Sequence, residues 1–232
     1  MSAVLSYTSR RQENALVEAL RQNDVPTVLE LLDFAPHLAH RNENGQSLPL
    51  LAALHGATDV AEVLVRNGAS LNIFAAAALG KVDHVECLLG LVPDLAREFN
   101  PDGWTALHLA AHFAHLSVAE VITSAGADID AVSRNSLAQT PLHTAAAVDA
   151  AEVVDLLLSL GANPNVKTAE GCTPMHIAAH VGSQDIVEQL MHHGADPNAA
   201  RNDSATPLMV ALLADHWQVI RLLRERRAIR WA

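Results

Sequence analysis

The stretch that decides the fold is GCTPMHIAAHVGSQDIVEQLMHHGADPN, residues 171–198. Thr173 can cap a helix whose first position, Pro174, lacks an N–H that would find no partner there in any case. Apolar residues recur at three- and four-residue intervals across 186–191, which indicates a second helix, and Gly194 stands where a left-handed C-cap is favoured. The stretch therefore predicts a helix, a turn, a second helix and an extended loop.

The same unit recurs along the chain at a nearly constant interval. The threonines that open the first helix are spaced by 35, 33 and 33 residues, and they are Thr105, Thr140, Thr173 and Thr206. A period near 33 residues that carries Thr-Pro-Leu-His before an Ala-Ala pair indicates a solenoid, in which each unit packs on its neighbours. These motifs resemble those of the ankyrin-repeat family, and the resemblance covers essentially the whole chain. It implies an all-α solenoid of helix-turn-helix repeats joined by β-hairpin loops.

The resemblance implies about seven repeats in one array. The predicted units are an N-terminal capping repeat at 11–41, a second repeat at 42–72, a loop-shortened third at 73–96, regular repeats at 97–130, 131–165 and 166–198, and a C-terminal capping repeat at 199–232. The third unit follows Asn72 without its hairpin loop, so we expect a notch or bend in the row of hairpins. The last unit has Met209 in place of the usual histidine, and its arginine-rich end predicts a polar outer face.

The composition restricts the classes of partner and compartment. Apolar residues make up 50% of the chain and aromatic residues 3%, which favours thin helices packed through Ala, Leu and Val. The formal charge of −11 repels phosphate backbones, so we expect no nucleic-acid partner. Two cysteines form no disulfide framework, and neither a signal-peptide core nor a run of about 18 apolar residues is present. We therefore expect a cytoplasmic protein without a membrane association.

Thirteen histidines suggest a metal site, above all the pairs His108/His112 and His176/His180, whose spacing places both rings on one helical face. The resemblance, however, implies a structural role near the hairpin for His108, His143 and His176. The two pairs lie two repeats apart, about 20 Å, whereas ligands of one zinc ion lie about 2 Å from it. We find no nucleophile with a base and no phosphate-binding loop. The prediction is a protein that is not an enzyme and has neither a metal nor a cofactor.

The resemblance implies partner binding through the hairpin tips and the exposed face of each first helix. Carried onto this sequence, the predicted partner-binding residues are Trp104, His112, Phe113, Gln139, Val148, Cys172, His180, Val181 and Leu213. Trp104 and Phe113 are two of only eight aromatic residues, and exposed aromatic side chains tend to mark interfaces. The alternative for these two is that Trp104 packs on a neighbouring hairpin and Phe113 on the adjoining helix.

The sequence thus predicts a non-enzymatic scaffold that binds another protein through a concave groove and its hairpin tips. One alternative is a homo-oligomer that uses the same apolar row or the C-terminal Arg/Trp segment, residues 221–231, so that a monomer and a homodimer both remain open. A second alternative is a metal or small-molecule binder that uses the histidine pairs. The identity of the partner is not specified, because this kind of scaffold is shared by proteins with different partners.

Overall fold

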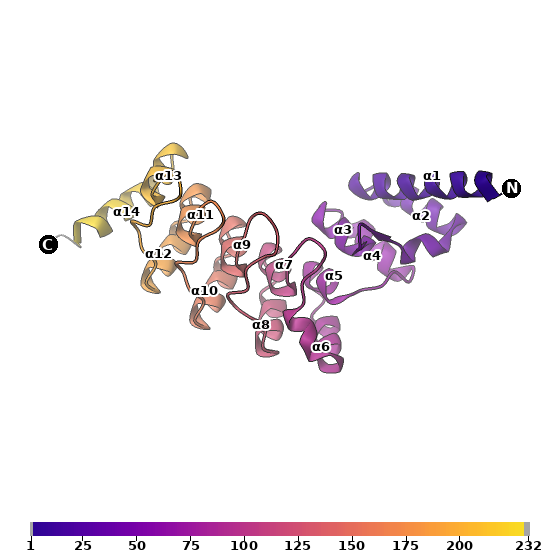
Figure 1. Ribbon diagram of the computed structural model, residues 1–232, viewed down its shortest axis with the longest axis horizontal. Coiled ribbons are helices and arrows are strands. Elements are labelled where there is room, and N and C mark those ends of the chain that lie inside the picture. The colour runs from indigo at the N-terminus through magenta and orange to yellow at the C-terminus, as the bar shows by residue number, and fades with distance from the viewer. Residues whose placement is uncertain (1, 230–232) are drawn as a thin grey trace.

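The computed structural model describes residues 2–229, with side-chain surroundings for 11–225, and shows an elongated array of helix pairs (Figure 1). The first helices of the pairs are α1 (Ser2–Arg21), α3 (Leu48–Leu54), α5 (Ile73–Ala78), α7 (Ala106–His112), α9 (Pro141–Ala147), α11 (Pro174–Val181) and α13 (Pro207–Leu213). The second helices are α2 (Val25–Phe34), α4 (Thr58–Arg66), α6 (Val82–Leu91), α8 (Leu116–Ser124), α10 (Ala151–Ser159), α12 (Gln184–His192) and α14 (Trp217–Ile229). The predicted all-α solenoid is confirmed.

Short elements connect the pairs. The 3-10 turns η1 (Pro36–His40) and η2 (Pro93–Arg97) follow α2 and α6. The strands β1 (Asn42–Glu43) and β2 (Gln46–Ser47) form an antiparallel hairpin with Glu43 opposite Gln46. No helix in the described part of the chain is long and apolar enough to cross a membrane.

The first helices from α3 to α13 pack side by side in one row, and small side chains at one position make this possible. Each first helix from α3 to α11 has an alanine near its C-terminal end. These alanines are Ala53, Ala77, Ala111, Ala146 and Ala179, and none is more than 1% exposed. Because a methyl group occupies little space, neighbouring helices approach closely and bury a continuous apolar core.

A histidine on the first turn of α7, α9 and α11 joins each repeat to the next. In α9, the Nε2 atom of His143 lies 3.1 Å from the carbonyl oxygen of Cys172 in the following hairpin. A carbonyl oxygen only accepts, so Nε2 carries the proton and Nδ1 accepts from the hydroxyl of Thr140 at 2.8 Å and from its N–H at 3.1 Å. Equivalent contacts join His108 to Gln139 and His176 to Ala205. The structural role that the resemblance implied for these histidines fits all three geometries.

The loop-shortened repeat produces a different bend from the one expected. The hairpin row has no notch there, because the side-chain amide of Gln46 donates a hydrogen bond to the carboxylate of Asp102 and closes the row directly. The opening lies on the side of the second helices, where a cavity of about 480 Å³ separates the end of α4 from the start of α6. Lys81 spans this side through an ion pair with Glu62 at 3.2 Å. Without a hairpin as a spacer, the first helices and hairpins close up while the second helices spread apart.

This opening divides the apolar interior into two clusters. One cluster contains buried residues between Leu16 and Ala69, and the other extends from Leu50 to Leu223. The two clusters meet at α3, whose two sides contribute to different clusters. Figure 1 accordingly shows α4 set apart from α6, whereas α6, α8, α10 and α12 follow one another in a regular row.

The last repeat ends with an apolar face, in contrast to the polar face expected of a terminal repeat. Leu212 occupies the position of the buried alanines but is 46% exposed. Met209 occupies the position of the bridging histidines and is 52% exposed. The arginine-rich end of α14 remains polar, with Arg221 and Arg224 exposed, so the difference lies in α13. The side chains from residue 226 onward, including those of the predicted Arg/Trp segment, lie outside the described residues.

Two further histidines join neighbouring repeats at the opposite ends of the first helices. His216 donates from Nε2 to the carbonyl oxygen of His180 at 2.9 Å, and His115 makes the same contact with Ala78 at 3.1 Å. Each ring lies against a glycine in the left-handed region, since a Cβ atom on Gly182 would lie 2.5 Å from the His216 ring and one on Gly80 2.9 Å from His115. A histidine at this position therefore requires a glycine in the preceding repeat.

We expect His143→Ala to destabilise the array by about 2–4 kcal/mol, because the substitution leaves a cavity and removes the partner of a buried carbonyl group. Chemical denaturation followed by circular dichroism measures this loss. The matched control is His192→Ala, which removes an exposed ring from the end of α12 and should change the stability by less than about 0.5 kcal/mol. Equal effects of the two substitutions would show that the bridge contributes nothing to stability.

Acid should unfold the array as its buried histidines take up protons. Burial lowers the pKa of His108 and of His143 to about 4 from an ordinary value of 6.5. Between these values the unfolded chain binds more protons than the folded chain, so stability falls as the pH falls from about 6.5 to about 4, by roughly 3 kcal/mol for each residue. Denaturation midpoints measured across this window test the expectation. The stability of a His143→Ala variant should depend less steeply on pH. The same pH dependence in the variant and the wild type would contradict this expectation.

Gly182→Ala should destabilise the protein more than Gly161→Ala. Both glycines have a positive φ, +87° and +93°, so both substitutions incur about 1–2 kcal/mol of backbone strain. Only the new methyl group at residue 182 meets a ring, which should add about 1–3 kcal/mol. In a His216→Ala background this additional cost should disappear, and a double-mutant cycle measured by denaturation will show whether it does.

Candidate functional site

The predicted partner-binding residues of the helices lie at the C-terminal ends of successive first helices. His112 ends α7, Phe113 and Val148 are the C-caps of α7 and α9, and His180 and Val181 end α11. Leu213 ends α13 and is 88% exposed. Because they occupy corresponding positions in successive repeats, these residues follow the same side of the array.

The predicted hairpin residues lie beside this row and contribute backbone as well as side chains. Gln139 and Cys172 are half-buried, and their carbonyl oxygens accept the hydrogen bonds from His108 and His143. Trp104, at the corresponding position, is also half-buried, and its backbone N–H donates to the side-chain oxygen of Asn100 at 2.8 Å. The hairpins are therefore held in place by the same contacts that join the repeats.

A pocket of about 140 Å³ lies between these hairpins and helices. It is lined by Leu54, Trp104, His108, Leu109, His112 and Thr144. The indole of Trp104 meets the ring of His108 edge to face, with 5.2 Å between the centroids, and so forms a fixed wall. Because most of its lining is aliphatic or aromatic, the pocket suits an apolar side chain.

A second pocket, of about 200 Å³, occupies the corresponding position two repeats further on. It is lined by Cys172, His176, Ile177, His180, Arg201 and Val210. Cys172, His176 and His180 correspond to Trp104, His108 and His112 of the first pocket. A thiol replaces the indole here, so the second pocket lacks the aromatic wall of the first.

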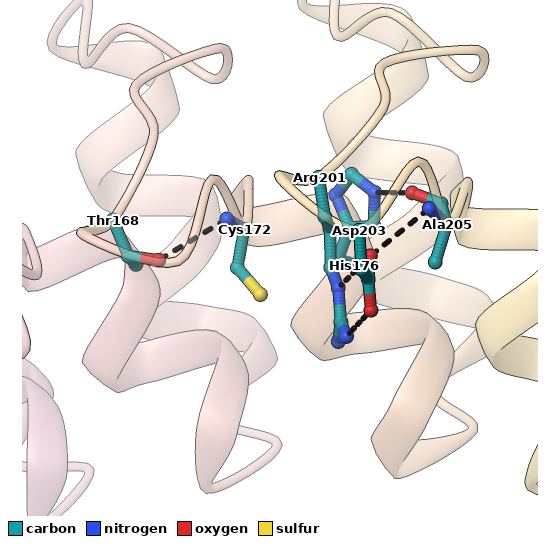
Figure 2. A network of polar contacts seen from close by, with 6 residues as sticks. All are labelled: Thr168, Cys172, His176, Arg201, Asp203 and Ala205. Carbon is teal, nitrogen blue, oxygen red and sulfur yellow. Dashed lines mark hydrogen bonds and ion pairs between the residues drawn. The ribbon is translucent and has the colours of Figure 1, made fainter.

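The second pocket also has a fixed cation at its rim. The guanidinium of Arg201 forms an ion pair with Asp203 at 2.5 Å, and Asp203 accepts a further hydrogen bond from the N–H of Ala205 at 3.0 Å (Figure 2). The contact with Arg201 lowers the pKa of Asp203 to about 2, so this carboxylate is ionised at neutral pH. On the other side, the N–H of Cys172 donates to the hydroxyl of Thr168 at 3.1 Å. The pair of pockets therefore combines one apolar site with one site that is lined by a guanidinium group, whose charge is paired with Asp203.

Phe113 is less available than a surface anchor would be. Its ring lies 4.9 Å from the ring of His112 and is stacked at 6.3 Å on the ring of His115. It also packs against the main apolar core, as the alternative based on packing supposed. Trp104 packs against the same core, and its side chain also lines the first pocket.

The pockets include residues that sequence reasoning did not choose. Leu109 lies one turn before the exposed end of α7, and Arg201 begins the hairpin that follows α12. The repeat period gives the position of Arg201, which corresponds to Thr168 one repeat earlier. It does not show that the guanidinium turns back toward Cys172, because that direction is set by the ion pair with Asp203.

In each histidine pair, the first histidine has no ring nitrogen free to bind a metal ion. Both ring nitrogens of His108 and of His176 are engaged in the bridges between repeats, and each residue is 1% exposed. His112 and His180 are exposed. In the described part of the chain, no group of three or more His, Cys, Asp or Glu residues is arranged to hold a metal ion.

Comparisons with known proteins relate the chain to repeat proteins. A family model described as ankyrin repeats (3 copies) matches residues 73–168, 125–201 and 142–230. Ankyrin repeat and SOCS box protein 16 of Homo sapiens is 31% identical over 173 residues, which are 67% of this chain and 38% of that protein. A probable E3 ubiquitin-protein ligase, XBOS31 of Oryza sativa subsp. japonica, is 40% identical over 93 residues, 40% of this chain and 20% of the relative.

A third relative is the neurogenic locus Notch protein of Drosophila melanogaster, 36% identical over 85 residues. These residues are 36% of this chain and 3% of that protein. The chain thus spans less than two fifths of the length of each of these three relatives.

Proposed function

Because the chain belongs to the ankyrin-repeat family, whose repeats generally serve as protein–protein interaction modules, we propose that it is a non-enzymatic scaffold that binds a segment of another protein along its concave groove. The observation that carries the proposal is the pair of pockets at corresponding positions two repeats apart. Both pockets lie on the row that contains His112, Val148 and His180. The net charge of −11 favours a partner that is neutral or basic outside the two contact points.

The spacing of the pockets defines the kind of segment that fits. With about 10 Å for each repeat, the pockets are about 20 Å apart. An extended chain rises about 3.3 Å for each residue, so its two anchoring side chains would be about six residues apart. The first anchor is apolar, to match Trp104 and Leu54, and the second carries a hydrogen-bond acceptor for Arg201. Exposed Val148 lies between them and accommodates the intervening residues.

The surroundings of Cys172 support a binding role over a catalytic one. His176 lines the same pocket and is a candidate base, but both of its ring nitrogens are occupied by Thr173 and Ala205, and burial lowers its pKa. It therefore cannot accept the proton of the thiol without breaking the bridge between repeats. Cys87 and Cys172 are both free thiols, which supports placing the protein in a reducing compartment such as the cytoplasm.

Site-specific photo-crosslinking tests the proposal with four matched substitutions. Benzoylphenylalanine replaces His112 or His180 in the groove, and His84 or His192 on the second helices; all four residues are exposed histidines. After irradiation in cell lysate, we expect one protein to be crosslinked from positions 112 and 180 and not from 84 or 192. Adding Trp104→Ala should reduce the yield at position 180 at least tenfold, because the first anchor is lost. Equal yields at all four positions, or crosslinks from the second helices alone, would rule out the groove.

A further inference from the structure

The C-terminal end of the array has a stacking face that nothing covers in the described chain. In earlier repeats, the positions of Met209 and Leu212 are covered by the next first helix, as shown by His176 at 1% and Ala179 at 0% exposure. At the last repeat, Met209 and Leu212 are about half-exposed. Leucine and methionine are also larger than alanine and lack the ring that bridges to a hairpin. The face is therefore suited to an apolar helix surface and not to another repeat with its hairpin.

Helix α14, which packs against α13, carries positively charged side chains. Trp217, Arg221 and Arg224 share one side of α14, and Trp217 is 61% exposed. The guanidinium of Arg221 lies over the Trp217 ring at 5.7 Å and 3.9 Å from Glu225, a distance typical of a weak surface ion pair. Arg224 is exposed beside them. We call Met209, Leu212, Trp217, Arg221 and Arg224 the C-terminal face.

The opposite end of the molecule carries a surface of complementary character. Helix α2 exposes Leu29 at 41% and Phe34 at 78%, together with the carboxylates of Glu30 and Asp33. At 100° for each residue, these four side chains fall within one side of the helix. Helix α2 has no lysine or arginine to neutralise them. We call these four residues the α2 face.

We propose that the C-terminal face of one molecule binds the α2 face of a second copy of the same chain. Apolar side chains would meet apolar side chains, and Arg221 and Arg224 would meet Glu30 and Asp33. Figure 1 places α2 and α14 at opposite ends of the elongated array, so one molecule cannot satisfy both faces by itself. The contact is head to tail, which produces open chains of copies unless the rotation between them closes a ring.

The overall charge limits this association but does not prevent it. Two copies at −11 each repel one another, yet at physiological ionic strength charges more than about 8 Å apart are largely screened. The opposite charges at the proposed contact would be closer than that, and salt does not weaken the burial of apolar side chains. We therefore expect self-association to weaken in high salt without disappearing. It uses neither pocket, so it is independent of the proposed groove function.

Sedimentation equilibrium on single-face variants tests the proposal. The wild-type mass should rise continuously with concentration from 24.7 kDa, without a plateau at the dimer. Leu212→Glu blocks the C-terminal face and Phe34→Arg blocks the α2 face, so each variant alone should remain at 24.7 kDa. An equimolar mixture of the two should form a heterodimer of twice that mass, because each variant keeps the face that the other has lost.

The control is Leu137→Glu. Leu137 lies in a hairpin remote from both faces, and it is 48% exposed, close to the 46% of Leu212. This variant should associate as the wild type does, and circular dichroism confirms that all variants are folded. A wild-type protein that stays monomeric at every concentration overturns the proposal. A dimer that persists in Phe34→Arg and disappears in Leu212→Glu overturns it as well, since it would show that two C-terminal faces bind each other.

Discussion

The bridge from the first-turn histidine of one repeat to the hairpin carbonyl of the next is the interaction on which the regular part of the array depends. It satisfies a buried ring, the N–H that precedes the helix and a buried carbonyl oxygen together, and each of these would be costly without a partner. The bridge fixes the distance between hairpins, so the half-buried residues beside it fall in line. The pockets of the groove lie directly on two of these bridges, at His108 and His176.

Two of the first helices that lack this bridge stand where the array differs from its regular part. Leu50 occupies the histidine position of α3, and the bend between α4 and α6 follows it. Met209 occupies the same position in α13, and there the array ends with an apolar face. In both places a connection that would join two neighbouring repeats is absent, so the geometry is set by other contacts, such as the ion pair between Lys81 and Glu62.

The proposed groove and the two ends of the molecule differ in the side chains that they present. The groove offers preformed pockets, one with an aromatic wall at Trp104 and one with a cation at Arg201, on a scaffold whose backbone is held by the bridges. The ends offer exposed apolar side chains on helices that also carry opposite charges. A rigid groove suits a foreign segment, whereas complementary ends suit further copies of the chain.

The sequence alone determined the repeat unit, the all-α solenoid and the row in which His112, Val148 and His180 lie, because these follow from local caps and a fixed period. It did not determine that the bend opens beside α4 and α6, that the Phe113 ring contacts the rings of His112 and His115 or that Arg201 lines a pocket. Those features depend on side-chain contacts that the repeat period does not specify, such as Gln46 with Asp102 and Arg201 with Asp203. The period specifies which positions correspond between repeats, and the family resemblance implies which of them face the groove. The shape and charge there arise only when the side chains pack together.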